Sequence, residues 1–127
     1  AKLAPGGRAY IGFGPLWNAP NGDHKRTRVV VPWLHAVLPH RLLVKRVNRT
    51  GGYQGQPISS IHDLGLNGYA LRDYERAFAE SGLDLVVFQV NHSDRPISRV
   101  FTALRRMPLL REYFSHNIYA VLQRPAS

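Results

Sequence analysis

Histidine is the side chain of this sequence best suited to acid–base chemistry, because the chain has six histidines and no cysteine. His24 ends a Pro-Asn-Gly-Asp-His turn sequence, and His35 follows a Pro-Trp-Leu segment. Imidazole titrates near neutral pH, so either side chain can take a proton from a substrate hydroxyl or amine. Either can instead hydrogen-bond to loop backbone. We therefore predict His24 and His35 as candidate general bases, with that structural role as the alternative.

Other reactive groups are poorly represented. The absence of cysteine excludes disulfides, thiolate zinc sites and cysteine nucleophiles. The nearest histidine pairs, His24 with His35 and His35 with His40, do not have the four-residue spacing of a zinc-binding helix, so no metal site is predicted. Ser59 and Ser60 lack a surrounding G-x-S-x-G motif. Three further histidines are predicted to be solvated or hydrogen-bonded: His62, His92 and His116.

Two tryptophans and an asparagine are candidate substrate-binding residues. Trp17 and Trp33 can stack on a planar substrate, or they can anchor the loops around them, since large aromatic side chains dominate core burial. Asn67 precedes a predicted helix, where it can orient a ligand or cap the helix.

The positive charge is concentrated in the first half of the chain. The formal net charge is +9, and residues 1–62 contain only one acidic residue, Asp23. This imbalance suggests an anionic partner such as nucleic acid, phosphate, a membrane surface or an acidic domain. The best patch lies within residues 24–49, but few aromatic residues alternate with its charges, as they do in single-strand binders. Its members are Lys25, Arg26, Arg28, Arg41, Lys45, Arg46 and Arg49.

The elements that must position these residues follow an α/β order. A Pro-Gly-Gly turn precedes a short strand at 8–13, and a long loop covers 15–32. Short helical turns are predicted at 32–38 and 41–47, with a loop at 48–62. Apolar residues spaced three and four apart predict a helix at 71–81.

The remaining elements continue this order towards residue 127. Residues 83–90 predict a strand covered on both faces. A helix opens near Pro96 and extends to Met107, and a last strand occupies 117–123. No run is apolar enough to span a bilayer, and we expect a soluble, cytoplasmic protein.

Three segments carry a resemblance to a known family. The opening KLAPGGRAYI (residues 2–11) is similar to the L-K-P-G-G-R-L-x-I turn before the fifth strand of class I S-adenosylmethionine-dependent methyltransferases. Tyr74, Phe78 and the Ser-Gly-Leu at 81–83 resemble the F…AGF junction before their sixth strand. The segment IYAVLQR (118–124) looks like their seventh strand. The matches cover most of the chain in the right order.

The resemblance implies a particular sheet and site. The first two strands should run parallel, with the last strand antiparallel between them. Ligands of such sheets bind beyond the carboxyl ends of the parallel strands. This gathers Trp17, His92 and His116 at one rim, which makes His92 a further candidate substrate-binding residue. The 15–68 insertion would be a lid on the substrate side.

The resemblance covers only the C-terminal part of such an enzyme. Gly12-Phe13-Gly14 is followed by Pro15 where a helix should begin, so it fails as a nucleotide-binding turn. We therefore expect residues 1–127 to form a single partial domain: turn and strand (1–14), insertion (15–68), and helix, strand, helical insertion and final strand (69–127). The intact protein would use S-adenosylmethionine, whereas this chain alone would bind no cofactor and be inactive.

Two other readings stay open. The chain can be a non-catalytic basic module that binds an anionic partner such as nucleic acid. It can also be a structural half that pairs through its exposed sheet edge with a missing N-terminal half or with itself.

Overall fold

The Pro-Gly-Gly turn leads directly into the sheet, as its sequence predicts. The computed structural model describes residues 2–126. Gly6 has a positive φ of 72°, which glycine adopts without strain, and its N–H donates to the Arg124 carbonyl at 3.0 Å. Strand β1 (Arg8–Phe13) follows at once. The turn therefore joins the start of β1 to the chain that leaves the last strand.

The sheet has three strands in the order β1-β3-β2. β3 (Ile118–Gln123) is antiparallel both to β1 and to β2 (Asp84–Val90), so the two outer strands run parallel to each other. The fold is α/β with an open sheet, as predicted, and the predicted strand order is confirmed.

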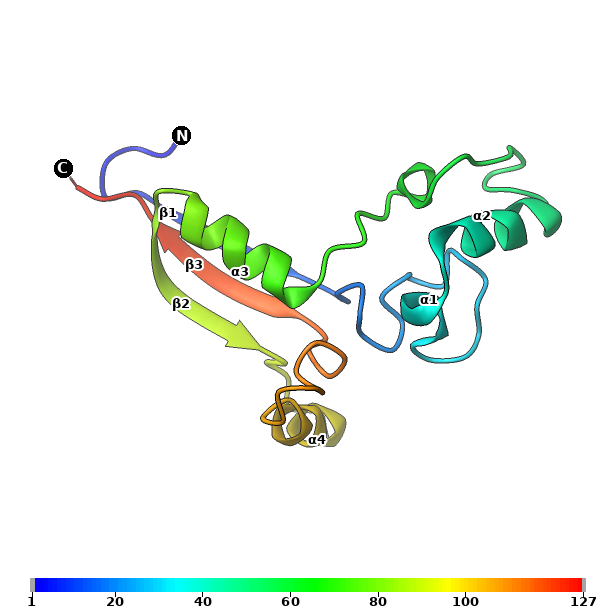
Figure 1. Cartoon of the computed structure of the whole chain (residues 1–127). Helices are drawn as coiled ribbons and strands as arrows, with labels where there is room; N and C mark the ends of the chain where they lie inside the picture. The colour runs from blue at the N-terminus through cyan, green and yellow to red at the C-terminus, as the bar shows by residue number, and fades with distance from the viewer. Residues whose placement is uncertain (1, 127) are drawn as a thin grey trace.

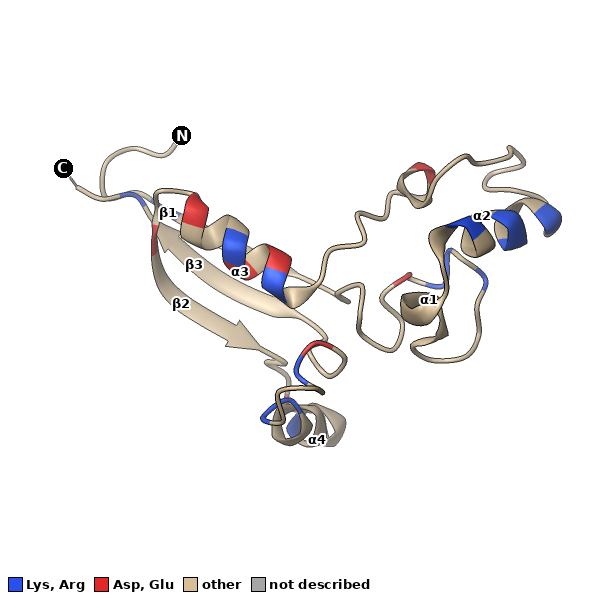
Figure 2. Ribbon diagram, in the orientation of Figure 1, with Lys and Arg blue, Asp and Glu red and all other residues tan. Residues whose placement is uncertain are grey.

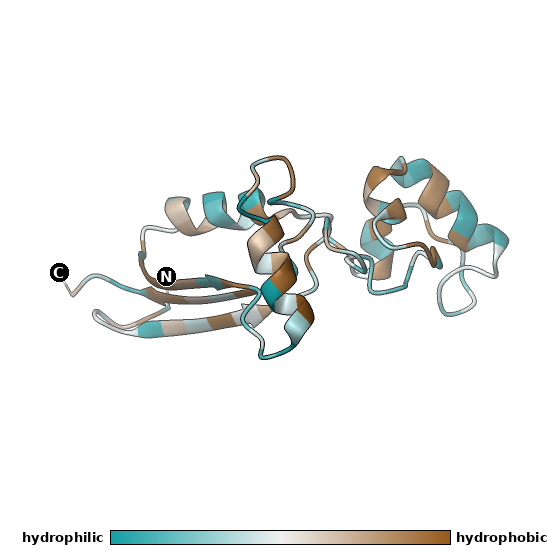
Figure 3. Cartoon of the chain, turned by 90° about the horizontal axis from the view of Figure 1, so that it is seen from below, coloured by the Kyte–Doolittle hydropathy of each residue, from teal (hydrophilic) through white to brown (hydrophobic). Residues whose placement is uncertain are grey.

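One helix covers one face of this sheet. α3 (Leu71–Glu80) lies along the strands (Figure 1), and its buried residues Leu71 and Phe78 pack on Ile118, Ala120 and Leu122 of β3. Its predicted apolar face is confirmed. In the view of Figure 3, α3 is drawn above the sheet, and the strands contain many hydrophobic (brown) residues.

The other face of the sheet is open, which corrects one prediction. The apolar run at 83–90 predicts a strand covered on both faces, yet Val87 is 37% exposed and Tyr119 of the central strand is 43% exposed. β2 is an edge strand, and within residues 2–126 no helix packs on this side. The Tyr119 ring lies on Gly12 of β1, where a Cβ atom would come within 3.1 Å of the ring.

The insertion between β1 and α3 builds a separate small core. It contains α1 (Leu34–Val37), α2 (His40–Arg49) and the 3-10 helix η1 (Ile61–Leu64), all at one end of the sheet (Figure 1). Pro39 separates the two helices as predicted, but α2 continues to Arg49 rather than ending at residue 47. The core consists of Trp17, Leu43, Val47, Ile58, Ile61, Leu64 and Leu66.

The helical segment between β2 and β3 starts where predicted but ends early. α4 (Pro96–Leu104) opens with proline in its first turn, and the carbonyl of Phe101 accepts from the N–H of Arg105 at 2.9 Å. Turns replace the predicted helix from Arg105 onward, so Met107 lies outside it. This segment lies at the same end of the sheet as the insertion (Figure 1).

Candidate functional site at the strand ends

The ends of β1 and β2 and the beginning of β3 meet at one edge of the sheet. Leu16, after β1, donates its N–H to the His116 carbonyl at 2.8 Å. Asn91, after β2, donates its N–H to the Asn117 carbonyl at 3.1 Å. Both connections therefore flank the residues that lead into β3. The predicted rim is present, and the parallel direction of the outer strands is what creates it.

Asn91 fixes the backbone at this rim. The residue is 6% exposed and has a positive φ of 61°. Its Nδ2 donates to the Phe114 carbonyl at 2.6 Å, and its Oδ1 accepts from the His116 N–H at 2.7 Å. A buried amide with both ends satisfied holds its neighbours rigidly. Asn91 therefore sets the position of His116.

A cavity of about 500 Å³ opens between the rim and α4. We call it the strand-end cavity. It lies between the Pro20–Asn21 turn, the segment after β2 and the first turns of α4. His92, a predicted substrate-binding residue, lines it, and the His92 ring meets Tyr119 edge-on at 5.8 Å. Its principal lining residues are His92, Arg95, Phe101, His116, Asn117 and Tyr119.

A second cavity, of about 170 Å³, lies between the end of β1 and the loop before α3. We call it the loop cavity. Trp17, His24 and Asn67 all line it, so the structure brings three predicted site residues together. Gly22 also lines this cavity. It packs tightly on the preceding backbone, since a Cβ atom there would lie 2.2 Å from the carbonyl oxygens of Leu16 and Trp17.

The polar groups of the loop cavity are partly engaged with one another. Asn67 donates from Nδ2 to the Tyr74 hydroxyl at 2.9 Å and accepts from the Tyr69 N–H at 3.0 Å. It does not cap α3, whose N-cap is Ala70. The His24 side chain is exposed, and its backbone has a positive φ of 53°. His24 is therefore the more accessible of the two predicted bases.

His35 has a different environment from His24. It is 1% exposed, and its Nε2 lies 2.7 Å from the Trp17 carbonyl. Because a carbonyl only accepts, Nε2 carries the proton and Nδ1 faces Asp23, 3.9 Å away. His35 lines neither of the two cavities at the rim. The geometry favours the structural alternative, in which His35 holds the loop that carries Trp17.

Trp33 also connects segments rather than lining either cavity. Its Nε1 donates to the Tyr113 carbonyl at 2.9 Å. Its ring lies 5.4 Å from the Phe114 ring and 6.5 Å from the Phe101 ring. These contacts attach the insertion to the segment around α4. Of the two predicted stacking residues, only Trp17 lines one of these two cavities.

His116 is the site residue that sequence reasoning undervalued. It was predicted to be solvated or hydrogen-bonded, but it lines the strand-end cavity beside Asn117. Burial lowers the pKa of His116 below its usual value, and the nearby His24 lowers it further. The imidazole is therefore neutral at physiological pH and can accept a proton. The available signal was its position immediately before β3, which begins at the edge of the sheet where β1 and β2 end.

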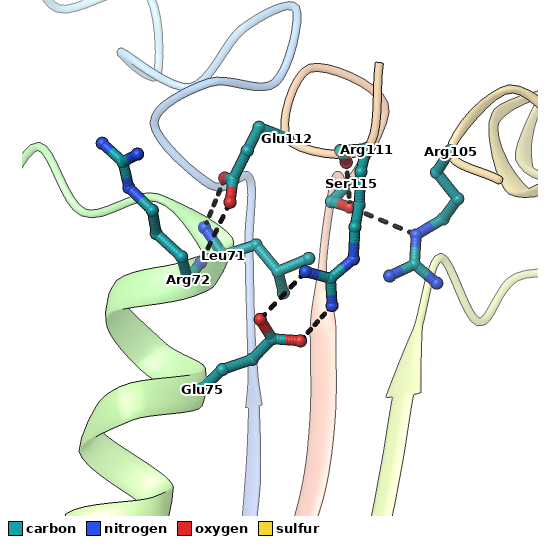
Figure 4. A network of polar contacts seen from close by, with 7 residues as sticks. All are labelled: Leu71, Arg72, Glu75, Arg105, Arg111, Glu112 and Ser115. Atoms are coloured by element: carbon teal, nitrogen blue, oxygen red, sulfur yellow. Dashed lines mark hydrogen bonds and ion pairs between the residues drawn. The ribbon is translucent and has the colours of Figure 1, made fainter. Parts of the chain in front are cut away.

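A polar network holds the segment between α4 and β3 against α3 (Figure 4). The Glu112 carboxylate accepts from the backbone N–H groups of Leu71 (3.0 Å) and Arg72 (3.2 Å), where α3 has unpaired donors. Arg111 forms a two-pronged ion pair with Glu75, with one contact of 3.1 Å.

Ser115 extends this network to the chain after α4. Its hydroxyl donates to the Arg111 carbonyl at 2.5 Å and accepts from Arg105 Nε at 3.2 Å. The network therefore orients the backbone that leads into His116.

Comparisons with known protein families, with curated proteins and with solved structures gave no match. Among residues 2–126, no group of three or more histidine and acidic side chains is placed to hold a metal ion. No helix of the same residues could cross a bilayer, since the two longest, α2 and α3, have ten residues each.

Proposed function

We propose that the chain is the C-terminal part of a class I S-adenosylmethionine-dependent methyltransferase. In the intact protein, it would hold the nucleophile, on a small molecule or a side chain, that accepts the methyl group. The observation that carries the proposal is the β1-β3-β2 order, with β3 antiparallel between two parallel strands. This order agrees with the fifth, seventh and sixth strands of that family, and the Pro-Gly-Gly turn lies directly before β1.

The proposal places the cofactor outside these residues. The G-x-G at residues 12–14 is followed by Pro15 and a loop instead of a helix. Asp23, the acidic residue nearest along the chain, is buried and accepts from the Thr27 hydroxyl at 2.5 Å. The residues at the rim therefore do not fit S-adenosylmethionine. The outer edge of β1 has no strand beside it within residues 2–126, and we propose that the cofactor-binding half pairs there.

The role left to this chain is to hold the acceptor. His24 lies at the loop cavity, exposed and beside Trp17, where it can take a proton from a substrate hydroxyl or amine. Trp17 and Asn67 shape that cavity, and His92 lines the adjoining strand-end cavity. His35 and Trp33 support these walls.

The test is a reading of the coding sequence upstream of this region, followed by binding to the intact product. We expect a strand that ends in a glycine-rich turn, and an acidic residue after the next strand. S-adenosylhomocysteine should raise the melting temperature of the intact protein and leave that of residues 1–127 unchanged. An intact protein that shows no shift would contradict the proposal. A shift with residues 1–127 alone would mean that the cofactor site is misplaced.

A second candidate function rests on the exposed face of α2. Arg41, Lys45 and Arg49 recur every four residues along one face of this helix, and all three are exposed. Figure 2 shows basic residues concentrated on α2, whereas α3 alternates both signs. Such a row suits a polyanion, so the chain can be a basic binding module.

Heparin affinity chromatography tests this second function. Replacing Arg41, Lys45 and Arg49 by glutamine should lower the salt concentration at which the protein elutes. The control replaces Arg72, Arg76 and Arg99, which removes the same charge from α3 and α4. Equal loss in the two variants would show that only net charge matters and would reject a binding face on α2.

A further inference from the structure

The strand-end cavity combines features that select a particular kind of ligand. It is lined by a guanidinium, two imidazoles and two serine hydroxyls, together with apolar side chains. No carboxylate belongs to its lining among residues 2–126. Cavities of a few hundred cubic ångströms with a few convergent polar groups bind small molecules. The cavity therefore has room for a small ligand in a positive environment.

Arg95 is the charged group of this cavity. Its guanidinium is exposed and has no hydrogen-bond or ion-pair partner within residues 2–126, in contrast to Arg111, which pairs with Glu75. Ser93 lies beside it and accepts from the Arg95 N–H at 3.3 Å. α4 begins at the next residue, so its N-terminal dipole adds to the positive potential. A planar guanidinium forms paired hydrogen bonds with carboxylates and phosphates.

Asn117 supplies the second feature. Its Oδ1 is buried and has no hydrogen-bond partner, the one such side-chain atom among residues 2–126. A buried acceptor without a partner costs free energy unless a ligand donor satisfies it. Asn117 and the half-buried His116 lie side by side along the chain where β3 begins, and both line the cavity. The half-buried His116 offers a proton acceptor to a ligand there, whereas the buried Oδ1 accepts from a ligand hydroxyl or amine only after the Asn117 side chain moves.

We propose that the strand-end cavity binds a small anionic ligand, a carboxylate or a phosphate ester that also carries a hydroxyl or amine. Arg95 holds the anionic group, and the hydroxyl or amine lies beside His116, where a shift of the Asn117 side chain lets Oδ1 accept a hydrogen bond from it. Phe101 and Tyr119 enclose the body of the molecule. If the proposed function holds, on which this reading as an acceptor rests, the ligand is the methyl acceptor. His116 of the strand-end cavity, in place of His24 of the loop cavity, then takes the proton released from the ligand's nucleophilic oxygen or nitrogen.

The test is a titration of residues 1–127 with three probes. All three carry a hydroxyl on a phenyl ring, and they differ in the group on the opposite ring carbon. These are 4-hydroxybenzoate, 4-hydroxyphenyl phosphate and the neutral 4-hydroxybenzamide. The readout is the NMR signal of the histidine rings together with the dissociation constant. We expect the two anions to bind and to shift His92 and His116, the preferred anion identifying carboxylate or phosphate. Binding of the amide as tightly as the anions would overturn the proposal.

Variants locate the site. Arg95→Gln should weaken anion binding by at least about tenfold, the factor for losing one charge-assisted hydrogen bond. The control, Arg99→Gln, removes the same charge one turn further along α4, outside the cavity lining, and should leave binding unchanged. Asn117→Asp adds a carboxylate beside the ligand and should abolish binding. Equal weakening by both arginine variants would overturn the proposal.

A negative result in this experiment does not bear on the proposed function, because ligand binding needs neither the cofactor nor methyl transfer. An intact protein that binds S-adenosylhomocysteine, with residues 1–127 that ignore all three probes, would overturn the ligand and leave the methyltransferase proposal standing. Anion binding in the cavity, with an intact protein that ignores S-adenosylhomocysteine, would overturn the methyltransferase proposal and retain the ligand site.

Discussion

The sheet region and the insertion are stabilised in different ways. In the sheet, every residue of β1 faces a residue of β3, from Arg8 opposite Gln123 to Phe13 opposite Ile118, and α3 covers the apolar side. In the insertion, no strand lies among residues 15–68, and side chains that bond to main-chain carbonyls replace strand pairing. The difference shows how a segment with little regular structure still forms a defined shape beside the site.

In the insertion, many of these hydrogen bonds to main-chain carbonyls come from arginine side chains. Arg26 donates to the Leu64 carbonyl at 2.5 Å, and Arg28 donates to the carbonyls of Thr50 and, at 2.9 Å, Gly52. Arg46 in turn donates two hydrogen bonds, of 3.1 and 3.0 Å, to the Arg28 carbonyl. A guanidinium can do this because it carries five donors in a fixed plane. Part of the basic patch is therefore structural, and positive charge alone does not identify a binding surface.

The largest expected effect comes from removing one leucine from each core. Leu43→Ala in the insertion and Leu71→Ala in α3 should each cost about 2–5 kcal/mol of unfolding free energy. Leu43→Ala should speed amide hydrogen exchange in residues 34–66 and leave the strands protected, whereas Leu71→Ala should speed exchange in the strands. Uniform acceleration by both variants would mean that the two regions unfold as one unit.

Asp23 should give the next largest effect. Its carboxylate is 1% exposed and accepts from the Thr27 hydroxyl and from the backbone N–H of Lys25 at 3.1 Å. Asp23→Ala leaves those buried donors without a partner and should lower the unfolding free energy by about 2–3 kcal/mol. Urea denaturation measures the loss. A control, Asp94→Ala, removes an exposed acid from the sheet region and should change stability by less than about 0.5 kcal/mol.

A smaller effect separates structural from free arginines. Arg46→Lys loses the paired bonds to the Arg28 carbonyl and should cost about 0.5–1 kcal/mol, since lysine cannot reproduce a planar fork. Arg49→Lys lies on the same helix with an exposed side chain and should cost almost nothing. Both variants keep the charge, so thermal denaturation compares geometry alone. An equal loss would refute the structural role of Arg46.

The smallest effect concerns pH. Burial first, and then His24, lowers the pKa of His116 below 6.5, so the unfolded chain binds a proton there that the folded chain does not. The unfolding free energy should therefore fall as the pH drops below about 6.5 towards the folded pKa. His116→Gln should make that fall shallower, by less than one proton, in urea denaturation at pH 7.5, 6.5 and 5.5. An unchanged slope in the His116→Gln variant would contradict this role of His116.

The helix that covers the sheet could be predicted because its signals are local. The three- and four-residue spacing from Leu71 to Phe78 defines α3, and the left-handed Gly82 ends it. The exposure of β2 could not be predicted, because an apolar run does not reveal which elements are present to cover it. The core of the insertion was missed because residues such as Trp17 and Leu64 are far apart in sequence and follow no period.

The placement of the candidate residues was predicted in outline for a topological reason. Strand direction alone brings Trp17, His92 and His116 to one rim. The role of His35 depends on a single carbonyl, that of Trp17, and no pattern in the sequence encodes that contact. His116 lines a cavity only because α4 forms its opposite wall, and no pattern in the sequence places α4 there.

The central strand of the sheet is the last of the three to be synthesised. Arg8 of β1 pairs with Gln123 of β3, which is synthesised more than a hundred residues later. Until then both outer strands carry open edges, and such distant pairing makes folding slow. A premature stop before residue 118 would remove the shared partner of both outer strands, so a truncated product would lose the whole sheet and expose itself to proteolysis.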